Sequence, residues 1–67
     1  MNLVPIQPDV RLDGRYSIGD TCKALGIHRH TLRKYSEAGE IHYRLRQGGK
    51  KIFYLGSEII KFWRNNT

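Results

Sequence analysis

Residues 16–46 read YSIGDTCKALGIHRHTLRKYSEAGEIHYRLR, and this stretch decides the fold. In its first part, apolar residues recur at intervals of three and four, which is the period of a helix with one buried face. Gly26 separates two such segments and Gly39 follows the second, and glycine often ends a helix in the left-handed conformation. Apolar and polar residues then alternate from position 41, which is typical of a strand. The stretch therefore predicts a helix, a turn, a second helix and a strand.

The two helices have recognisable start signals. We expect the first to start at Ser17, because Ser17 and Asp20 have the spacing of an N-cap and the residue that supports it. The second is expected over residues 28–38, with His28 at its N-cap. Serine or threonine is the usual residue there, so we expect His28 to leave a helix amide available to an anion such as a phosphate.

A hairpin and a third helix are expected after residue 40. Two glycines in the segment 47–50 suit a tight turn between the strand that begins at residue 41 and a return strand. Ser57 can cap the last helix, with Glu58 favourable in its first turn. The predicted fold class is mostly α with a small β-hairpin, in the order helix, helix, hairpin, helix. The side chains expected in its single core are Ile18, Cys22, Leu25, Ile27, Leu32, Tyr35, Ile41, Tyr43, Ile52, Tyr54, Ile59 and Trp63.

A chain of 67 residues has room for one small domain. Residues 1–14 contain two prolines and no sustained period, so we expect an extended N-terminal arm. Several apolar side chains in the arm suggest that it packs on the domain or on another copy. The domain itself is expected over residues 15–64, followed by a short tail over residues 65–67.

The charge of the chain is concentrated in one region. Twelve Lys or Arg and six Asp or Glu give a net charge of +6. The stretch 28–51 alone holds seven of the basic and two of the acidic residues, a net charge of +5. Such a cluster favours a polyanionic partner, although a merely solvated basic surface is the plain alternative.

The second predicted helix presents its cations on one side. Leu32 and Tyr35 define its inward face, and a rotation of about 100° per residue turns the basic side chains outward. Arginine and lysine at such positions reach guanine edges or phosphates in the major groove of double-stranded DNA. The expected contacts from this helix are His28, Arg29, His30, Thr31, Arg33 and Lys34, with Arg29, His30 and Arg33 at the bases and Lys34 at the backbone.

The hairpin is predicted to act as a wing that lies along the DNA backbone or minor groove. Arg44 and Arg46 share one face of its first strand, and two lysines follow the turn. An ordinary surface hairpin whose charges protect an exposed edge is the alternative. The expected contacts from the wing are Arg44, Arg46, Gln47, Lys50 and Lys51.

Other classes of function are disfavoured. A single cysteine allows no internal disulfide, no apolar run approaches the about 20 residues of a membrane span, and the N-terminus lacks the pattern of a signal peptide. We therefore expect a cytoplasmic, nucleoid-associated protein without a membrane partner. His28 and His30 diverge on a helix, so we expect no metal site, and no motif indicates an enzyme, a cofactor or catalytic residues.

Four segments carry a resemblance to a known family: YSIGD at 16–20, ALGI at 24–27, TLRKY at 31–35 and AGEI at 38–41. In order and spacing they resemble the winged helix-turn-helix domain of the MerR superfamily, over about residues 15–64. Within it, the chain is most similar to small excisionase-type proteins of mobile elements, the recombination directionality factors. Such proteins bind adjacent DNA sites cooperatively, bend the DNA and assist an integrase. The resemblance thus implies double-stranded DNA, an integrase or recombinase and further copies of this chain as partners.

Two classes of function stay open. MerR-type regulators continue into a dimerisation helix and an effector domain, and the 67 residues contain neither, so we expect no small-molecule ligand. The first class is a sequence-preferring DNA binder, either excisionase-like or a small MerR-like transcription regulator. The second is a protein-interaction module that binds a partner through its last helix or its N-terminal arm.

Overall fold

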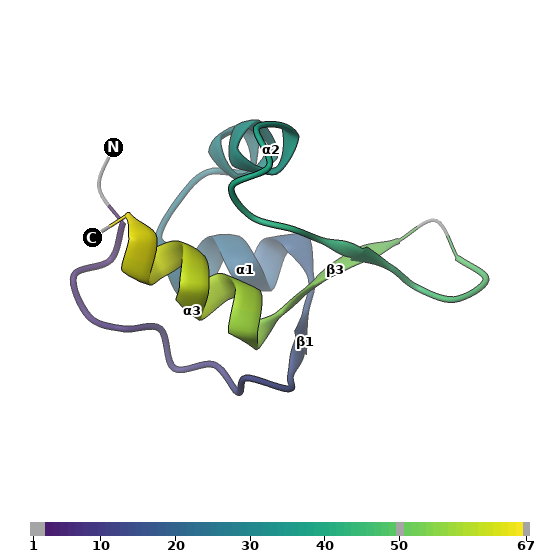
Figure 1. Cartoon of the computed structure of the whole chain (residues 1–67), viewed down its shortest axis with the longest axis horizontal. Coiled ribbons are helices and arrows are strands. Elements are labelled where there is room, and N and C mark those ends of the chain that lie inside the picture. Colours follow the sequence, from purple (N-terminus) through teal and green to yellow (C-terminus); the bar gives the residue numbers. More distant parts are fainter. Residues whose placement is uncertain (1–2, 50, 67) are drawn as a thin grey trace.

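The computed structural model describes residues 3–49 and 51–66. Its elements are β1 (Arg15–Tyr16), α1 (Ile18–Leu25), α2 (Arg29–Glu37), β2 (Arg44–Leu45), β3 (Ile52–Leu55) and α3 (Gly56–Asn65). In Figure 1, α2 lies above α1 and α3, and the hairpin of β2 and β3 extends away from the helices. Three helices with a small antiparallel hairpin form a winged helix-turn-helix domain, so the predicted fold class is confirmed.

The sheet has three strands, and β3 lies between the other two in the order β1-β3-β2. Both pairings are antiparallel, with Tyr16 opposite Tyr54 and Leu45 opposite Ile52. The hairpin pairing is the predicted one, whereas β1 is an addition. Two residues are too few to show a period, so no local pattern indicates this strand.

Both ends of α1 follow the predicted signals. The Ser17 hydroxyl accepts a hydrogen bond from the backbone N–H of Asp20 at 3.1 Å. Gly26 has φ 71° in the left-handed region, and its N–H donates to the carbonyl of Cys22 at 2.8 Å. Because glycine adopts this conformation without steric cost, the chain turns sharply into α2.

The start of α2 differs from the expectation in one respect. The backbone N–H of His30 donates to Nδ1 of His28 at 3.3 Å, so His28 caps the helix with its imidazole. The expectation that His28 leaves an amide available to an anion is therefore wrong for the amide of His30. An unprotonated imidazole nitrogen is an acceptor, and it reaches the amide two residues on as a serine hydroxyl does.

Helix α3 begins at Gly56, one residue before the predicted cap. Leu55 occupies the N-cap position, and no side chain caps the helix, so the prediction for Ser57 is wrong. The N–H of Gly56 instead donates to the carbonyl of Gly14 at 2.9 Å, and that of Ser57 to the carbonyl of Leu12 at 3.0 Å. Carbonyls of the N-terminal arm thus satisfy amides that a helix end leaves unpaired.

The core lies between the three helices and β3. Its buried cluster comprises Cys22, Leu25, Leu32, Ile41, Tyr54, Ile59 and Phe62. Phe62, at 1% exposure, was not among the predicted core residues, and Tyr43, which was, is 48% exposed. Strand β2 covers only two residues, so the alternation that begins at Ile41 does not continue as a regular buried strand. The other predicted members, Ile18, Ile27, Tyr35, Ile52 and Trp63, pack partly buried against the cluster.

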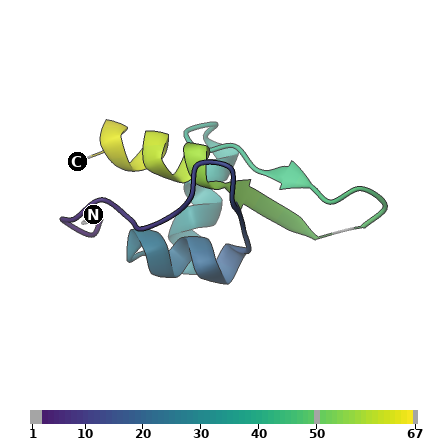
Figure 2. The same ribbon diagram turned by 90° about the horizontal axis from the view of Figure 1, so that it is seen from below.

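The N-terminal arm packs on its own domain. Figure 2 shows it passing along α1 and α3. The N–H of Val4 donates to the carbonyl of Leu25 at 3.1 Å, and the indole Nε1 of Trp63 donates to the carbonyl of Val4 at 2.8 Å. Leu3 and Val10 pack against the core. The arm therefore connects the end of α1 with α3.

Candidate nucleic-acid interface

Helix α2 turns one face to the core and the other to solvent. Leu32 is 1% exposed, and the ring of Tyr35 packs edge-on against Phe62 at 4.7 Å between ring centres. The side chain of Arg33 is 78% exposed. This is the orientation expected from the helical rotation, and it leaves the cations of α2 accessible.

The predicted contact residues of α2 are not equally accessible. Thr31 is half-buried, so it offers less of its side chain to a partner than its neighbours do. The rings of His28 and His30 stack at 5.2 Å with an angle of 12° between their planes. This stack lies at the start of the helix. The exposed members of the set are His28, Arg29, His30, Arg33 and Lys34.

A pair of hydroxyl groups fixes α2 relative to the hairpin. The Ser36 hydroxyl donates to the carbonyl of Leu32 at 3.0 Å, so the Tyr54 hydroxyl, 2.5 Å away, donates to Ser36. Burial raises the pKa of Tyr54. The tyrosine therefore remains a donor at neutral pH. Sequence reasoning did not find Ser36, because a serine in the last turn of a helix carries no signal of its own.

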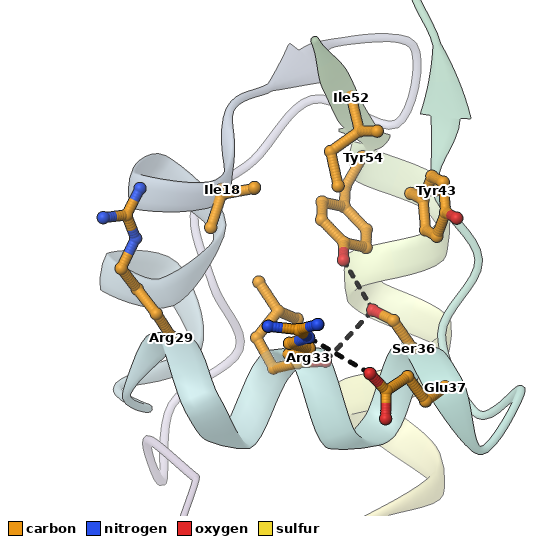
Figure 3. A pocket seen from close by; sticks show the side chains of 9 residues that line it. Ile18, Arg29, Arg33, Ser36, Glu37, Tyr43, Ile52 and Tyr54 are labelled. Atoms are coloured by element: carbon orange, nitrogen blue, oxygen red, sulfur yellow. Dashed lines mark hydrogen bonds and ion pairs between the residues drawn. The ribbon is translucent and has the colours of Figure 1, made fainter. Parts of the chain in front are cut away.

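A groove of about 540 Å³ lies between α2 and the hairpin. In Figure 3, Ile18, Ile52 and Tyr54 point into it, while Arg29 and Arg33 project from α2 beside it. The groove thus combines apolar walls with two guanidinium groups. Its lining residues are Ile18, Arg29, Leu32, Arg33, Ser36, Glu37, Tyr43, Ile52 and Tyr54.

Arg33 and Glu37 form an ion pair along the exposed face of α2. The Nε atom of Arg33 donates to Oε1 of Glu37 at 3.1 Å. Their side chains are 78% and 66% exposed, so water screens the attraction. Such pairs stabilise a free protein by at most about 1 kcal/mol. The pair therefore has more effect on the position of the guanidinium than on the stability of the fold.

The wing carries its cations on the face away from the groove. Residues directly opposite in a sheet share a face, and Arg44 is opposite Phe53 while Tyr54 points to the groove. The N–H of Arg46 donates to the carbonyl of Lys51 at 3.0 Å, so the pairing continues one residue past β2 and alternation places Arg46 on the same side as Arg44. The Arg15 guanidinium lies 5.2 Å above the Phe53 ring and joins this face. Sequence reasoning missed Arg15 because β1 itself was not predicted.

The tip of the wing is a turn with one left-handed glycine. Gly48 has φ 75°, and the N–H of Gly49 donates to the carbonyl of Arg46 at 3.1 Å. Gln47 and Lys51 are exposed on either side of the turn. Lys50, also predicted to contact DNA, lies outside the described residues.

Cys22 is a core residue. Burial raises the pKa of its thiol, and the Arg29 guanidinium opposes that shift. Within residues 3–49 and 51–66, no three His, Cys, Asp or Glu side chains are arranged to hold a metal ion. In the same part of the chain, no helix is long and apolar enough to cross a membrane.

Comparison with known proteins identifies the family. A family model described as a helix-turn-helix domain matches residues 15–67. The chain belongs to this family, which is one of small DNA-binding domains, and its fold implies double-stranded DNA as the partner. No curated protein and no solved structure matches the chain.

Proposed function

We propose that the protein binds double-stranded DNA with sequence preference, by placing α2 in the major groove. The observation that supports this most directly is the orientation of α2, with Leu32 buried and the Arg33 side chain 78% exposed. Arginine can donate to both O6 and N7 of guanine, so Arg29 and Arg33 are assigned to base edges. Lys34 is assigned to phosphate, which positions the helix without reading sequence. In this proposal the protein acts by binding and not by catalysis.

The wing supplies phosphate contacts in this proposal. Arg44 and Arg46 share a face with Arg15, and no acidic side chain belongs to the described strand residues 15–16, 44–45 and 52–55. A stretch of backbone along this face meets several positive charges at once. Because phosphates repeat regularly, such contacts add affinity for any sequence.

The biological role we propose is that of an excisionase-like architectural factor of a mobile element. The support is the resemblance over about residues 15–64. One module of this size buries only about 600–1,000 Å² on DNA, so cooperative binding to adjacent sites would compensate for modest affinity. Bending of the DNA and assistance to an integrase belong to the same proposal. Footprinting and bending assays on attachment-site DNA separate this role from a small MerR-like transcription regulator.

A protein-interaction role has support at the arm and not at α3. Ile60 and Phe62 are 6% and 1% exposed, and the Trp63 indole donates a hydrogen bond to the arm. These side chains of α3 are therefore used within the domain and are not available to a partner. Ile6 and Leu12 of the arm are 77% and 63% exposed. A partner protein such as an integrase would contact the arm at these two side chains.

A substitution at Arg33 tests DNA binding by α2. Arg33→Ala should weaken binding about tenfold on a duplex selected by the wild-type protein from a random pool, because one base contact is lost. Arg64→Ala, which removes an exposed arginine from α3, should change the affinity little. Fluorescence anisotropy gives both affinities, and circular dichroism checks folding. Equal affinities for Arg33→Ala and the wild type would exclude α2 as the reading element.

A further inference from the structure

We infer that Glu37 is a positioning residue that gives Arg33 its preference for a guanine over a phosphate. This inference rests on the proposed function, because it concerns how α2 reads DNA. Three features support it: a contact, an energetic disadvantage and a charge, each at the same end of α2.

The contact leaves the outer end of the guanidinium available. Glu37 Oε1 accepts from the Nε atom of Arg33 at 3.1 Å, which fixes one side of the planar group. Within residues 3–49 and 51–66, no hydrogen bond engages its two terminal nitrogens. Those two nitrogens form a fork that matches O6 and N7 of guanine. The ion pair therefore orients the group without occupying the atoms that would read the base.

Helix stability does not account for a carboxylate at position 37. Glu37 is the last residue of α2, where a negative charge opposes the helix dipole. An arginine that precedes a glutamate by four residues is also the less favourable order for such a pair. The dipole disfavours Glu37 in the free protein and the pair in this order compensates little, so a benefit of Glu37 is expected in the complex.

Electrostatics explain what that benefit is. Glu37 lines the groove together with Arg33, on a helix whose exposed side chains are otherwise mostly basic. If Arg33 bound a phosphate, the carboxylate beside it would be held close to a second negative charge. A guanine edge offers neutral acceptors and causes no such repulsion. Glu37 thus lowers affinity for DNA in general and raises discrimination in favour of guanine.

The test is selection from a random duplex pool, with Glu40→Gln as the matched control. Glu40 is also exposed, but it lines a different hollow, with His42 and Glu58. The wild type should enrich a motif with a guanine whose preference disappears in Arg33→Ala. Glu37→Ala should lower that preference about tenfold and raise affinity for unselected DNA. Glu37→Gln keeps an acceptor for Nε and should retain part of the preference, whereas Glu40→Gln should change only general affinity.

A double variant decides whether Glu37 acts through Arg33. If it does, Arg33→Ala combined with Glu37→Ala should select the same motif as Arg33→Ala alone. An unchanged guanine preference in Glu37→Ala, or an equal loss in Glu40→Gln, would overturn the inference while DNA binding stands. A motif that does not depend on Arg33 would overturn it as well. A wild-type protein that enriches no motif would contradict the sequence preference in the proposed function itself.

Discussion

Gly56 occupies a position where a side chain has no room. A Cβ atom at this residue would collide with the carbonyl oxygen of Arg11 and press on Leu12. The arm approaches this closely because its carbonyls cap α3, so the glycine and the capping contact depend on each other. This requirement is steric and concerns a segment distant in sequence.

Substitution of Gly56 tests that close approach. Gly56→Ala should lower the free energy of unfolding by about 1–3 kcal/mol, because the arm must move away from α3. Gly19→Ala is the matched control, since the nearest atom to its Cβ is the Ser17 hydroxyl at 3.9 Å. Inside α1 that change should be neutral or stabilise by up to about 1 kcal/mol. Urea unfolding of both variants gives the comparison, and equal stabilities would contradict the steric account.

At the scale of elements, local signals were sufficient for α1 and for the hairpin of β2 and β3, but not for the start of α3 or for β1. Helix α1 begins after Ser17 and ends before Gly26, as predicted, because an N-cap and a left-handed glycine each act on the adjacent turn of the helix. The start of α3 was misjudged because its amides bind carbonyls of residues 12 and 14, which no local pattern reveals. Strand β1 was missed for the same reason, since it is defined by its pairing with β3.

The same limit applies to the candidate interface. The outward direction of Arg33 follows from the helical period and was predictable. Its ion pair with Glu37 is also local, at a spacing of four residues. Which face of the hairpin borders the groove depends on how β3 packs on α2, so the side occupied by Arg44 could not be inferred from sequence.

The contact between β3 and α2 can be tested at Tyr54. Tyr54→Phe removes the hydroxyl that donates to Ser36 and should cost about 1 kcal/mol of unfolding free energy. The raised pKa of Tyr54 means that the folded state holds its proton more tightly than the unfolded state does. The stability that this difference in proton binding contributes is complete below the ordinary tyrosine pKa of 10.0. It is lost as the pH rises through the pKa of Tyr54 in the folded state. Urea titrations at alkaline pH should therefore show a smaller loss of stability in Tyr54→Phe than in the wild type.

The wing can be tested through salt dependence. Replacing both Arg44 and Arg46 by alanine should reduce the slope of log affinity against log salt by about one unit per lost phosphate contact. Arg11→Ala, in the arm, removes an exposed arginine that pairs with Asp13 at 3.4 Å and should leave the slope unchanged. A slope that stays constant in the double variant would place the wing outside the interface.

At the scale of the whole molecule, the arm stabilises the domain from the side away from α2. The carbonyl of Val4 accepts a hydrogen bond from the Trp63 indole, and the N–H of Val4 donates to Leu25 at the end of α1. Leu3 and Val10 pack against the core. Helix α2 takes no part in these contacts. Stability and DNA binding should therefore be separable by changes in the arm.

Deletion of residues 1–12 tests this separation. Loss of the apolar contacts and of the hydrogen bonds should lower the free energy of unfolding by about 2 kcal/mol or more. Trp63 is the single tryptophan of the chain, so its fluorescence should report the loss of its bond to Val4. Affinity for a selected duplex, measured where the shortened chain is folded, should change little. A large loss of affinity there would show that the arm contributes to the interface.

The capping of α3 by the arm also has a consequence for the order of folding. The amides of Gly56 and Ser57 find their acceptors near the opposite end of the chain, so these bonds form only after a long loop has closed. Detachment of the arm exposes the same two amides to solvent. Their hydrogen-exchange rates would therefore measure how often the arm opens, independently of global unfolding.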